Sequence, residues 1–380
     1  MAASTTENVL LLGMDIGGAN IKCASIPLKD ADQLNKASST KHFFPLWEKT
    51  VHELSAQLAR VVDEHVASAR NILDNTKTVT IYTCASITGE LSDAFSSKKE
   101  GIECITSCLS EALVSPKNKR QGFAIMRPRF VTTNGTLLSE DGARSNHRAV
   151  SAANWYATAA WVGSFEPDCI LIDCGSTTTD IIPIANGKPA TKGLTDIERL
   201  RHGELVYTGV LRATIPSIAH AVPVHGELIP ISFEKFALMA DVHLILGNIT
   251  REQYDCDTAD GRPNTIEDSK KRLARIVCED AAELGDDVIL NMARFLAQEQ
   301  VRMVQNGLEK VTRQYDRTLT CVLTGVGEGF LAMQAARQAG FNKIIPLAEK
   351  IGKPSSTVSS ALGVLHILAS YLKGVGFNGW

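Results

Sequence analysis

The sequence predicts an α/β protein made of two duplicated halves that flank a central cleft. The first observation is a repeated pattern: residues 9–26 read VLLLGMDIGGANIKCASI, and residues 169–184 read CILIDCGSTTTDIIPI. Each copy is an apolar run, an Asp, one residue, a Gly, a cluster of small residues and a second apolar run, which is typical of two buried strands joined by a tight turn. The second observation is that helical and extended patterns alternate after each copy. An internal duplication accounts for both.

Composition restricts the class of protein. A chain of 380 residues is long enough for two domains, and 44% hydrophobic with 21% charged residues is ordinary for a soluble protein. A net charge of −3 without a basic stripe argues against a nucleic-acid partner. The nine cysteines form no CxxC pair, and no apolar run approaches the length of a membrane span. We expect a cytoplasmic protein without a membrane partner, and composition leaves open whether it forms a homo-oligomer.

The first half, residues 1–165, begins with the first hairpin. Apolar residues at helical spacing predict a helix over 52–73, and TVTIYTCAS predicts a strand over 78–86. A turn and a helix are predicted within 87–113, followed by extended structure over 123–135. An Ala-rich and aromatic segment, 147–165, predicts a buried helix that leads into the second hairpin.

The second half, residues 166–380, repeats this order. An irregular insertion is expected at about 185–250, although its last part, 232–249, is apolar at helical period. Two long helices are predicted over 266–284 and 286–313, and a strand, a Gly-rich turn and a helix over 319–340. KIIPL predicts a strand, and we expect the terminal helix, 356–372, to pack back toward the first domain.

The two turns carry the strongest functional signal. Gly and small hydroxyl residues let backbone N–H groups approach phosphate oxygens without a side chain in the way. Mg²⁺ binds a few carboxylates together with waters and phosphate oxygens. The candidate metal ligands are Asp15, Asp173 and Asp180, of which Asp15 and Asp180 are also candidate catalytic residues. The candidate phosphate contacts are Gly17, Gly18, Asn20, Lys22, Gly175, Ser176, Thr177, Thr178 and Thr179.

Three loops resemble those of the acetate/sugar kinase–Hsp70–actin superfamily. DIGGANIK is similar to its first phosphate loop, DCGSTTTD to its second, and TGVGEG to its nucleotide-binding loop. SITGELSDAF, AANW, GELVYTGVLR, TADGRP and RLARIVCED resemble the hydantoinase A/oxoprolinase-like branch, and within it the synthases of methanofuran and methylofuran biosynthesis, a pathway of C1 metabolism linked to tetrahydromethanopterin. The resemblance implies two RNase H-like domains of the actin-like ATPase type around the cleft.

The resemblance also implies an activity. It implies a transferase that joins the phenol oxygen of γ-glutamyltyramine to the methylene carbon of (5-(aminomethyl)furan-3-yl)methyl diphosphate and releases diphosphate, with Mg²⁺ as the cofactor. Backbone N–H groups, Lys22 and Mg²⁺ would stabilise the leaving diphosphate. A phenol with a pKa of about 10 benefits from a base, and the candidates are Glu90, Asp93 and Asp260.

The third loop departs from the kinase pattern, because Val326 and Glu328 interrupt its glycine run. Glu328 would either pair with the ammonium of the furan substrate or cap the helix that follows. The candidate substrate-binding residues are Gly325, Gly327, Glu328, Arg262 and Glu204. Two other classes stay open: an ATP-dependent small-molecule kinase or oxoprolinase/hydantoinase-like amidohydrolase, and a nucleotide-switched binding protein. ATP binding and the number of glutamates on the acceptor also stay open.

Overall fold

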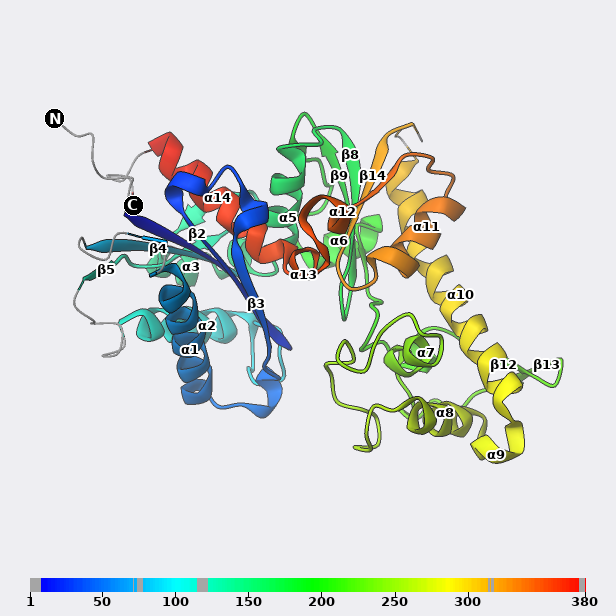
Figure 1. The fold of residues 1–380 in the computed structure, drawn as a ribbon. Helices are drawn as coiled ribbons and strands as arrows, with labels where there is room; N and C mark the ends of the chain where they lie inside the picture. The colour runs from blue at the N-terminus through cyan, green and yellow to red at the C-terminus, as the bar shows by residue number, and fades with distance from the viewer. Residues whose placement is uncertain are drawn as a thin grey trace.

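Two β-sheets, each covered by helices, form the two halves of the molecule. The computed structural model of the protein describes residues 8–70, 72–73, 78–114, 122–313, 315, 318–375 and 380. The first sheet lies with the N-terminal half of the chain, and the second lies beside α10 and α11 (Figure 1). The C-terminal helix α14 (Ser359–Val375) crosses back to the first half.

The first sheet has the strand order β3-β2-β1-β4-β6-β7, with β5 beside β4. β1 pairs antiparallel with β2 and parallel with β4, and β2 pairs antiparallel with β3. Eight of the nine residues of β1 are buried, so the apolar run forms a central strand. The strands are β1 (Val9–Gly17), β2 (Asn20–Pro27), β3 (Ser38–Phe43), β4 (Val79–Thr88), β5 (Phe123–Ile125), β6 (Arg129–Val131) and β7 (Leu137–Leu138).

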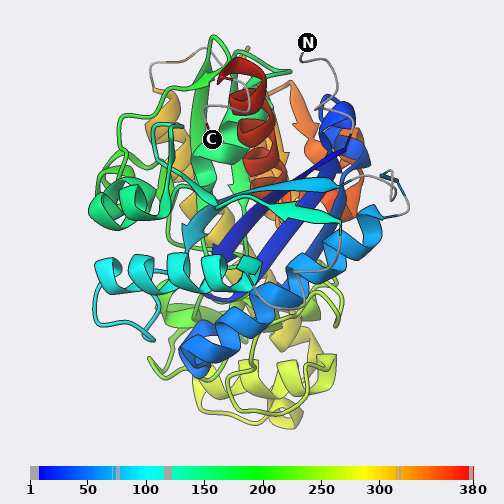
Figure 2. The ribbon, with the colours of Figure 1, turned by 90° about the vertical axis from the view of Figure 1, so that its left-hand side faces the viewer.

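Helices cover both faces of this sheet (Figure 2). α1 (Val51–Ala69) and α2 (Lys98–Val114) pack on the face that carries Leu10 and Leu12, while α5 (Asn154–Gly163) and α14 pack on the opposite face. At Gly13 a Cβ atom would lie 2.6 Å from the Ala361 carbonyl oxygen, so only glycine permits this approach of α14. The predicted helix over 52–73 is observed as α1, and residue 71 lies outside the described residues. Two short helices, α3 (Glu140–Ser145) and α4 (His147–Val150), precede α5.

The second sheet repeats this topology with the order β10-β9-β8-β14-β15, and β11 beside β9. β8 pairs antiparallel with β9 and parallel with β14, as β1 does with β2 and β4. The predicted fold class, two duplicated RNase H-like domains, is thereby confirmed. The strands are β8 (Cys169–Cys174), β9 (Thr179–Ala185), β10 (Lys188–Pro189), β11 (Leu205–Val206), β14 (Thr320–Thr324) and β15 (Ile344–Pro346). The helices are α6 (Asp196–His202), α10 (Asp286–Thr312), η7 (Glu328–Ala332), α11 (Met333–Gln338), α12 (Leu347–Ile351) and α13 (Lys353–Ser356).

A separate lobe extends from the second half at the lower right of Figure 1. Its own apolar core runs from Ile215 to Leu296, and therefore well beyond the insertion expected at about 185–250, because α8, α9 and the start of α10 pack into it. The helix predicted over 232–249 is correct only for α7, since the segment before it is irregular and its Ser232 N–H bonds to the Ile276 carbonyl. The lobe contains β12 (Ala221–Val224), β13 (Glu227–Pro230), α7 (Met239–Ile245), α8 (Ile266–Ala274) and α9 (Ala281–Leu284).

The cysteines and the helices bear on the expectations of free thiols and of no membrane span. All nine cysteines are free, and six of them are buried. Within the part of the chain that is described, no helix has both the length and the apolar character needed to cross a bilayer.

Candidate active site

The first hairpin ends in a buried, fully engaged carboxylate. Asp15 lies at the end of β1, opposite Lys22 of β2, and is 3% exposed. Its Oδ1 accepts hydrogen bonds from Ser86 Oγ (3.1 Å) and Thr88 Oγ1 (3.3 Å) of β4, and its Oδ2 accepts one from Ser360 Oγ (2.6 Å). Lys22 Nζ lies 3.5 Å from the same Oδ2 and donates to Ser360 Oγ at 3.3 Å. Asp15 therefore orients Lys22 and has no oxygen free of a protein partner.

The first turn is held open by close backbone packing. Leu46 N–H donates to the Gly18 carbonyl at 2.8 Å, and a Cβ atom on Gly89 would lie 3.1 Å from the Gly17 carbonyl carbon. The space next to Gly18 is open, because the nearest atom to a Cβ built there is 4.0 Å away. The Oδ1 of Asn20 is buried and accepts no hydrogen bond from a described residue. Among the predicted phosphate contacts of this turn, Gly18 leaves open space beside its backbone. The unpartnered Asn20 Oδ1 is an acceptor and needs a donor or a cation rather than a phosphate oxygen.

The second hairpin presents a carboxylate that protein groups leave free. Asp173 lies opposite Asp180 in the antiparallel register, at the position that Asp15 has in the first hairpin. It is half-buried, and no hydrogen bond joins its carboxylate to another described residue. Burial raises the pKa of Asp173 to about 7, with Asp180 and Asp15 acting in the same direction and Lys22 in the opposite one. Charges of the first hairpin thus act on the second, so the two hairpins face each other.

Asp180 forms an ion pair with a buried arginine. Arg199 Nη1 donates to Asp180 Oδ1 at 2.8 Å, Arg199 Nη2 donates to the Glu204 carbonyl at 2.9 Å, and the guanidinium lies 4.4 Å from the centre of the Trp155 ring. Burial raises the pKa of Asp180, although Arg199 opposes the shift. The Glu204 carboxylate accepts N–H groups of Lys192 (2.6 Å) and Gly193 (3.0 Å). Glu204 therefore fixes a loop, and the expectation that it binds substrate is not supported.

The second turn is supported by the backbone of a neighbouring segment. Gly175 N–H bonds to the Thr178 carbonyl, and the segment 208–212 packs along the turn, with Val210 N–H donating to the Gly175 carbonyl at 3.0 Å. Thr179 Oγ1 points inward and donates to the Thr208 carbonyl at 2.8 Å. The other three hydroxyl groups are partly exposed and bond to no described residue, so they remain available to a ligand; they belong to Ser176, Thr177 and Thr178.

The third loop supports the second hairpin. Gly325 has φ +90°, and a Cβ atom there would lie 2.4 Å from the Cys174 carbonyl oxygen; at Gly327 it would lie 2.6 Å from Cys174 Sγ. Glu328 is buried, and its Oε1 and Oε2 accept the Ala348 N–H at 3.2 and 3.3 Å, beside the start of α12. The expected pairing of Glu328 with a substrate ammonium is therefore not supported, because its carboxylate caps a helix.

Glu90 is the candidate base that lies beside a hairpin. It follows Gly89, which packs against Gly17, and it is 2% exposed. Its Oε2 has no hydrogen-bond partner among the described residues. Burial raises the pKa of Glu90 to about 7. Asp93, three residues further on, is exposed in a turn.

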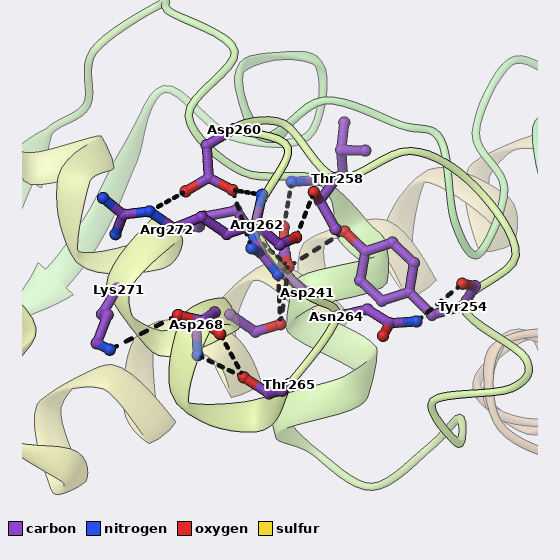
Figure 3. A network of polar contacts seen from close by, with 12 residues as sticks. Asp241, Tyr254, Thr258, Asp260, Arg262, Asn264, Thr265, Asp268, Lys271 and Arg272 are labelled. Carbon is purple, nitrogen blue, oxygen red and sulfur yellow. Dashed lines mark hydrogen bonds and ion pairs between the residues drawn. The ribbon is translucent and has the colours of Figure 1, made fainter.

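Asp260 and Arg262 lie in the polar network of the lobe (Figure 3). Asp260 accepts Arg272 Nη1 at 3.0 Å and Arg275 Nη1 at 3.3 Å. Although burial acts to raise it, the backbone N–H of Arg262 and the Arg272 guanidinium hold the pKa of Asp260 below its usual value. Arg272 is in turn paired with Asp241 at 2.8 Å, and both side chains are inaccessible. The base role expected of Asp260 is not supported, since its arginine partners stabilise the ionised form.

Three contacts cross between the halves and border the cleft. Lys98 Nζ of α2 lies 3.0 Å from Asp196 Oδ2 of α6, Lys41 of β3 pairs with Asp255, and the Arg212 guanidinium lies 4.3 Å from the centre of the Trp47 ring. A cavity of about 360 Å³ opens beside the Lys41–Asp255 pair. It is lined by Lys41, Phe43, Glu252, Gln253, Asp255, Val326 and Thr357.

A magnesium site built from three aspartates is not observed. No group of three or more His, Cys, Asp or Glu side chains gathers within the described ranges. Asp15 is paired with Lys22, and Asp180 is paired with Arg199. Asp173 alone fits Mg²⁺, as a single carboxylate that would share the ion with waters and phosphate oxygens.

Comparisons with known proteins show the family of the chain. Residues 81–371 match the hydantoinase/oxoprolinase family. A curated protein of Methanocaldococcus jannaschii, (4-{4-[2-(gamma-L-glutamylamino)ethyl]phenoxymethyl}furan-2-yl)methanamine synthase, is 33% identical over 365 residues, which are 96% of this chain and 99% of the relative. The synthase of the same name from Methanococcus vannielii is 33% identical over 211 residues, 55% of this chain and 94% of the relative.

Among solved structures, a nucleotide-free acetone carboxylase is 11% identical with a TM-score of 0.49, covering 93% of this chain and 70% of that one. That likeness is too distant to bear on function. The relatives are synthases, so the chain is an enzyme. It belongs to the hydantoinase/oxoprolinase family and, within it, to the family of these furanylmethanamine synthases.

Proposed function

We propose that the protein condenses (5-(aminomethyl)furan-3-yl)methyl diphosphate with γ-glutamyltyramine in methanofuran or methylofuran biosynthesis. The observation that carries the proposal is the similarity to a synthase of this product over 96% of the chain. The phenol oxygen forms a bond to the furan methylene carbon, and the bond from that carbon to diphosphate breaks with its electron pair on diphosphate. The phenol proton goes to a base.

The leaving diphosphate binds between the two turns. Lys22, oriented by Asp15 and Ser360, supplies a positive charge. The open space beside Gly18 lets the diphosphate approach the backbone of the turn. Mg²⁺, when bound through Asp173, would neutralise further charge on the diphosphate. Because a furan stabilises positive charge on its attached methylene, stabilisation of the leaving group contributes most to the rate.

Glu90 accepts the proton of the phenol. Its pKa of about 7 suits transfer at neutral pH, and its unpartnered Oε2 has a free acceptor position. The side chain is buried beside the charges of Lys98 and Asp196, the ion pair that joins the two halves. The acceptor therefore reaches Glu90 by separating this pair. We place the long acceptor in the cavity that Phe43 and Lys41 line.

The test is an assay of the purified protein with the furan diphosphate and γ-glutamyltyramine in Mg²⁺ buffer, with mass spectrometry of the aryl ether and measurement of released diphosphate. We expect one diphosphate per ether formed. Calorimetry with ATP tests the alternative classes. Tight ATP binding with stoichiometric ADP release during turnover would overturn the synthase proposal in favour of an ATP-dependent kinase or amidohydrolase.

A further inference from the structure

The backbone of Arg212 is hydrogen-bonded to the second phosphate turn. Its backbone N–H donates to the Ser176 carbonyl at 3.0 Å, and so does that of Leu211. At Gly209 a Cβ atom would lie 2.6 Å from the backbone of both Ser176 and Thr177, so this segment can pack against the turn only with glycine there. The backbone position of Arg212 is therefore fixed relative to the turn that we expect to contact phosphate.

The Arg212 side chain extends to the first half of the molecule. Its guanidinium lies 4.3 Å from the centre of the Trp47 ring. Trp47 belongs to the short helix η3 (Leu46–Glu48), and the N–H of the preceding Leu46 bonds to the Gly18 carbonyl in the first turn. Arg212 thus connects a segment bonded to one turn with a segment bonded to the other.

The charge of Arg212 lacks an acidic partner. No carboxylate in the described part of the chain forms an ion pair with it, and no carbonyl or side chain there accepts a hydrogen bond from its guanidinium. Two fully buried arginines of the second half differ: Arg199 pairs with Asp180, and Arg272 pairs with Asp241 and Asp260. A half-buried guanidinium has five donors, and contact with an aromatic face satisfies the charge but none of these donors. An anion in the cleft would satisfy them.

We propose that Arg212 binds the diphosphate group of the substrate directly, and that Trp47 positions it. The proposal rests on the proposed function for the identity of the anion. A guanidinium presents paired N–H groups that match two phosphate oxygens, which a lysine ammonium does not. Lys22 from the first half and Arg212 from the second would then hold the diphosphate from both sides. The bound diphosphate would also connect the two halves.

The experiment uses inorganic diphosphate as the probe, with isothermal titration calorimetry of the full chain in Mg²⁺ buffer. Arg212→Gln is expected to weaken diphosphate binding at least about tenfold, and Arg212→Lys is expected to restore only part of the affinity. Trp47→Leu should weaken binding less than Arg212→Gln, and Trp47→Phe should retain most of it. Arg294→Gln is the matched control, since Arg294 is exposed on α10 of the lobe. Thermal unfolding of each variant shows whether the fold is retained.

Wild-type affinity in a folded Arg212→Gln variant would overturn the proposal, as would a wild-type protein that does not bind diphosphate. An equal loss in Arg294→Gln would also overturn it, because the effect would then be one of net charge. The proposed function fails separately: diphosphate binding that depends on Arg212, without formation of the aryl ether, would refute the synthase reaction and leave the role of Arg212 in place.

Discussion

The two hairpins have the same register but differ in charge where they close. In the first, Asp15 lies opposite Lys22, and in the second, Asp173 lies opposite Asp180. The first hairpin balances its own charge, whereas the second places two carboxylates side by side and draws Arg199 from α6 to one of them. Asp173 is left without a cation, and its pKa rises to about 7. The two copies of one hairpin pattern thus differ in the charge that they carry.

The largest expected effect on stability comes from breaking the Arg199–Asp180 ion pair of the second hairpin. Arg199→Met leaves Asp180 buried without its partner, and removing one member of a buried ion pair costs about 3–5 kcal/mol of unfolding free energy. Urea unfolding measures the loss. The double variant Arg199→Met with Asp180→Asn should recover part of it, since no buried charge then stays unpaired. A loss below about 1 kcal/mol in Arg199→Met would show that water or a neighbour replaces the arginine.

The next effect concerns Glu90, beside the first turn, whose pKa is raised by burial. In the folded protein this pKa is about 7 against an ordinary 4.5. The folded state therefore retains a proton that the unfolded state releases, and stability falls as pH rises from 4.5 to 7. Glu90→Gln should remove this loss and be about 3 kcal/mol more stable than the wild type at pH 8, with little difference at pH 4.

Urea unfolding of both proteins across that pH range measures the Glu90 effect. Turnover of Glu90→Gln should fall by about 100-fold or more, so the variant would be more stable and less active. Parallel stability curves for the two proteins would contradict the raised pKa. Unchanged turnover would contradict the role as a base.

A third prediction separates the metal role of the second hairpin from the phosphate role of the first. Asp173→Asn should remove the additional thermal stabilisation that Mg²⁺ gives to the diphosphate-bound protein, while diphosphate alone still stabilises it through Lys22. The expected loss of Mg²⁺-dependent affinity is about tenfold or more, measured by thermal shift and calorimetry. Asp287→Asn, an exposed control on α10 in the lobe, should behave as the wild type. Full Mg²⁺ dependence in Asp173→Asn would exclude Asp173 as the ligand.

The smallest stability effect is expected for Lys22→Met. Its side chain is 25% exposed, so breaking its pair with Asp15 should cost less than about 1 kcal/mol, in contrast to Arg199. Turnover should nevertheless fall at least about tenfold, because a charge that faces the diphosphate is lost. Equal destabilisation by Lys22→Met and Arg199→Met would show that the two hairpins are equivalent structural elements after all.

Much of the fold could be predicted because its signals are local. Apolar runs, Asp-x-Gly turns and helical periodicity each lie within a few residues, and they correctly indicated β1, β2, β8, β9, α1 and α10. The single helix predicted over 266–284 was wrong, since Cys278 has φ +62° and separates α8 from α9. The extent of the lobe was underestimated, because a core formed by several distant segments leaves no contiguous pattern.

The sequence by itself determined the two hairpins, their shared register and the different charges at their ends, because turn chemistry and strand alternation are encoded between neighbours. Only the tertiary structure decided what each charged side chain does. Ser360, 345 residues from Asp15, completes the first cluster, and no local signal beyond the small residues of the terminal helix indicated it. Glu328 and Glu204 are candidate substrate contacts by sequence, yet the Glu328 carboxylate accepts the N–H of Ala348, and that of Glu204 accepts the N–H groups of Lys192 and Gly193. A carboxylate is satisfied by whichever donors the packed chain brings within about 3 Å, and that choice depends on contacts between segments far apart in sequence.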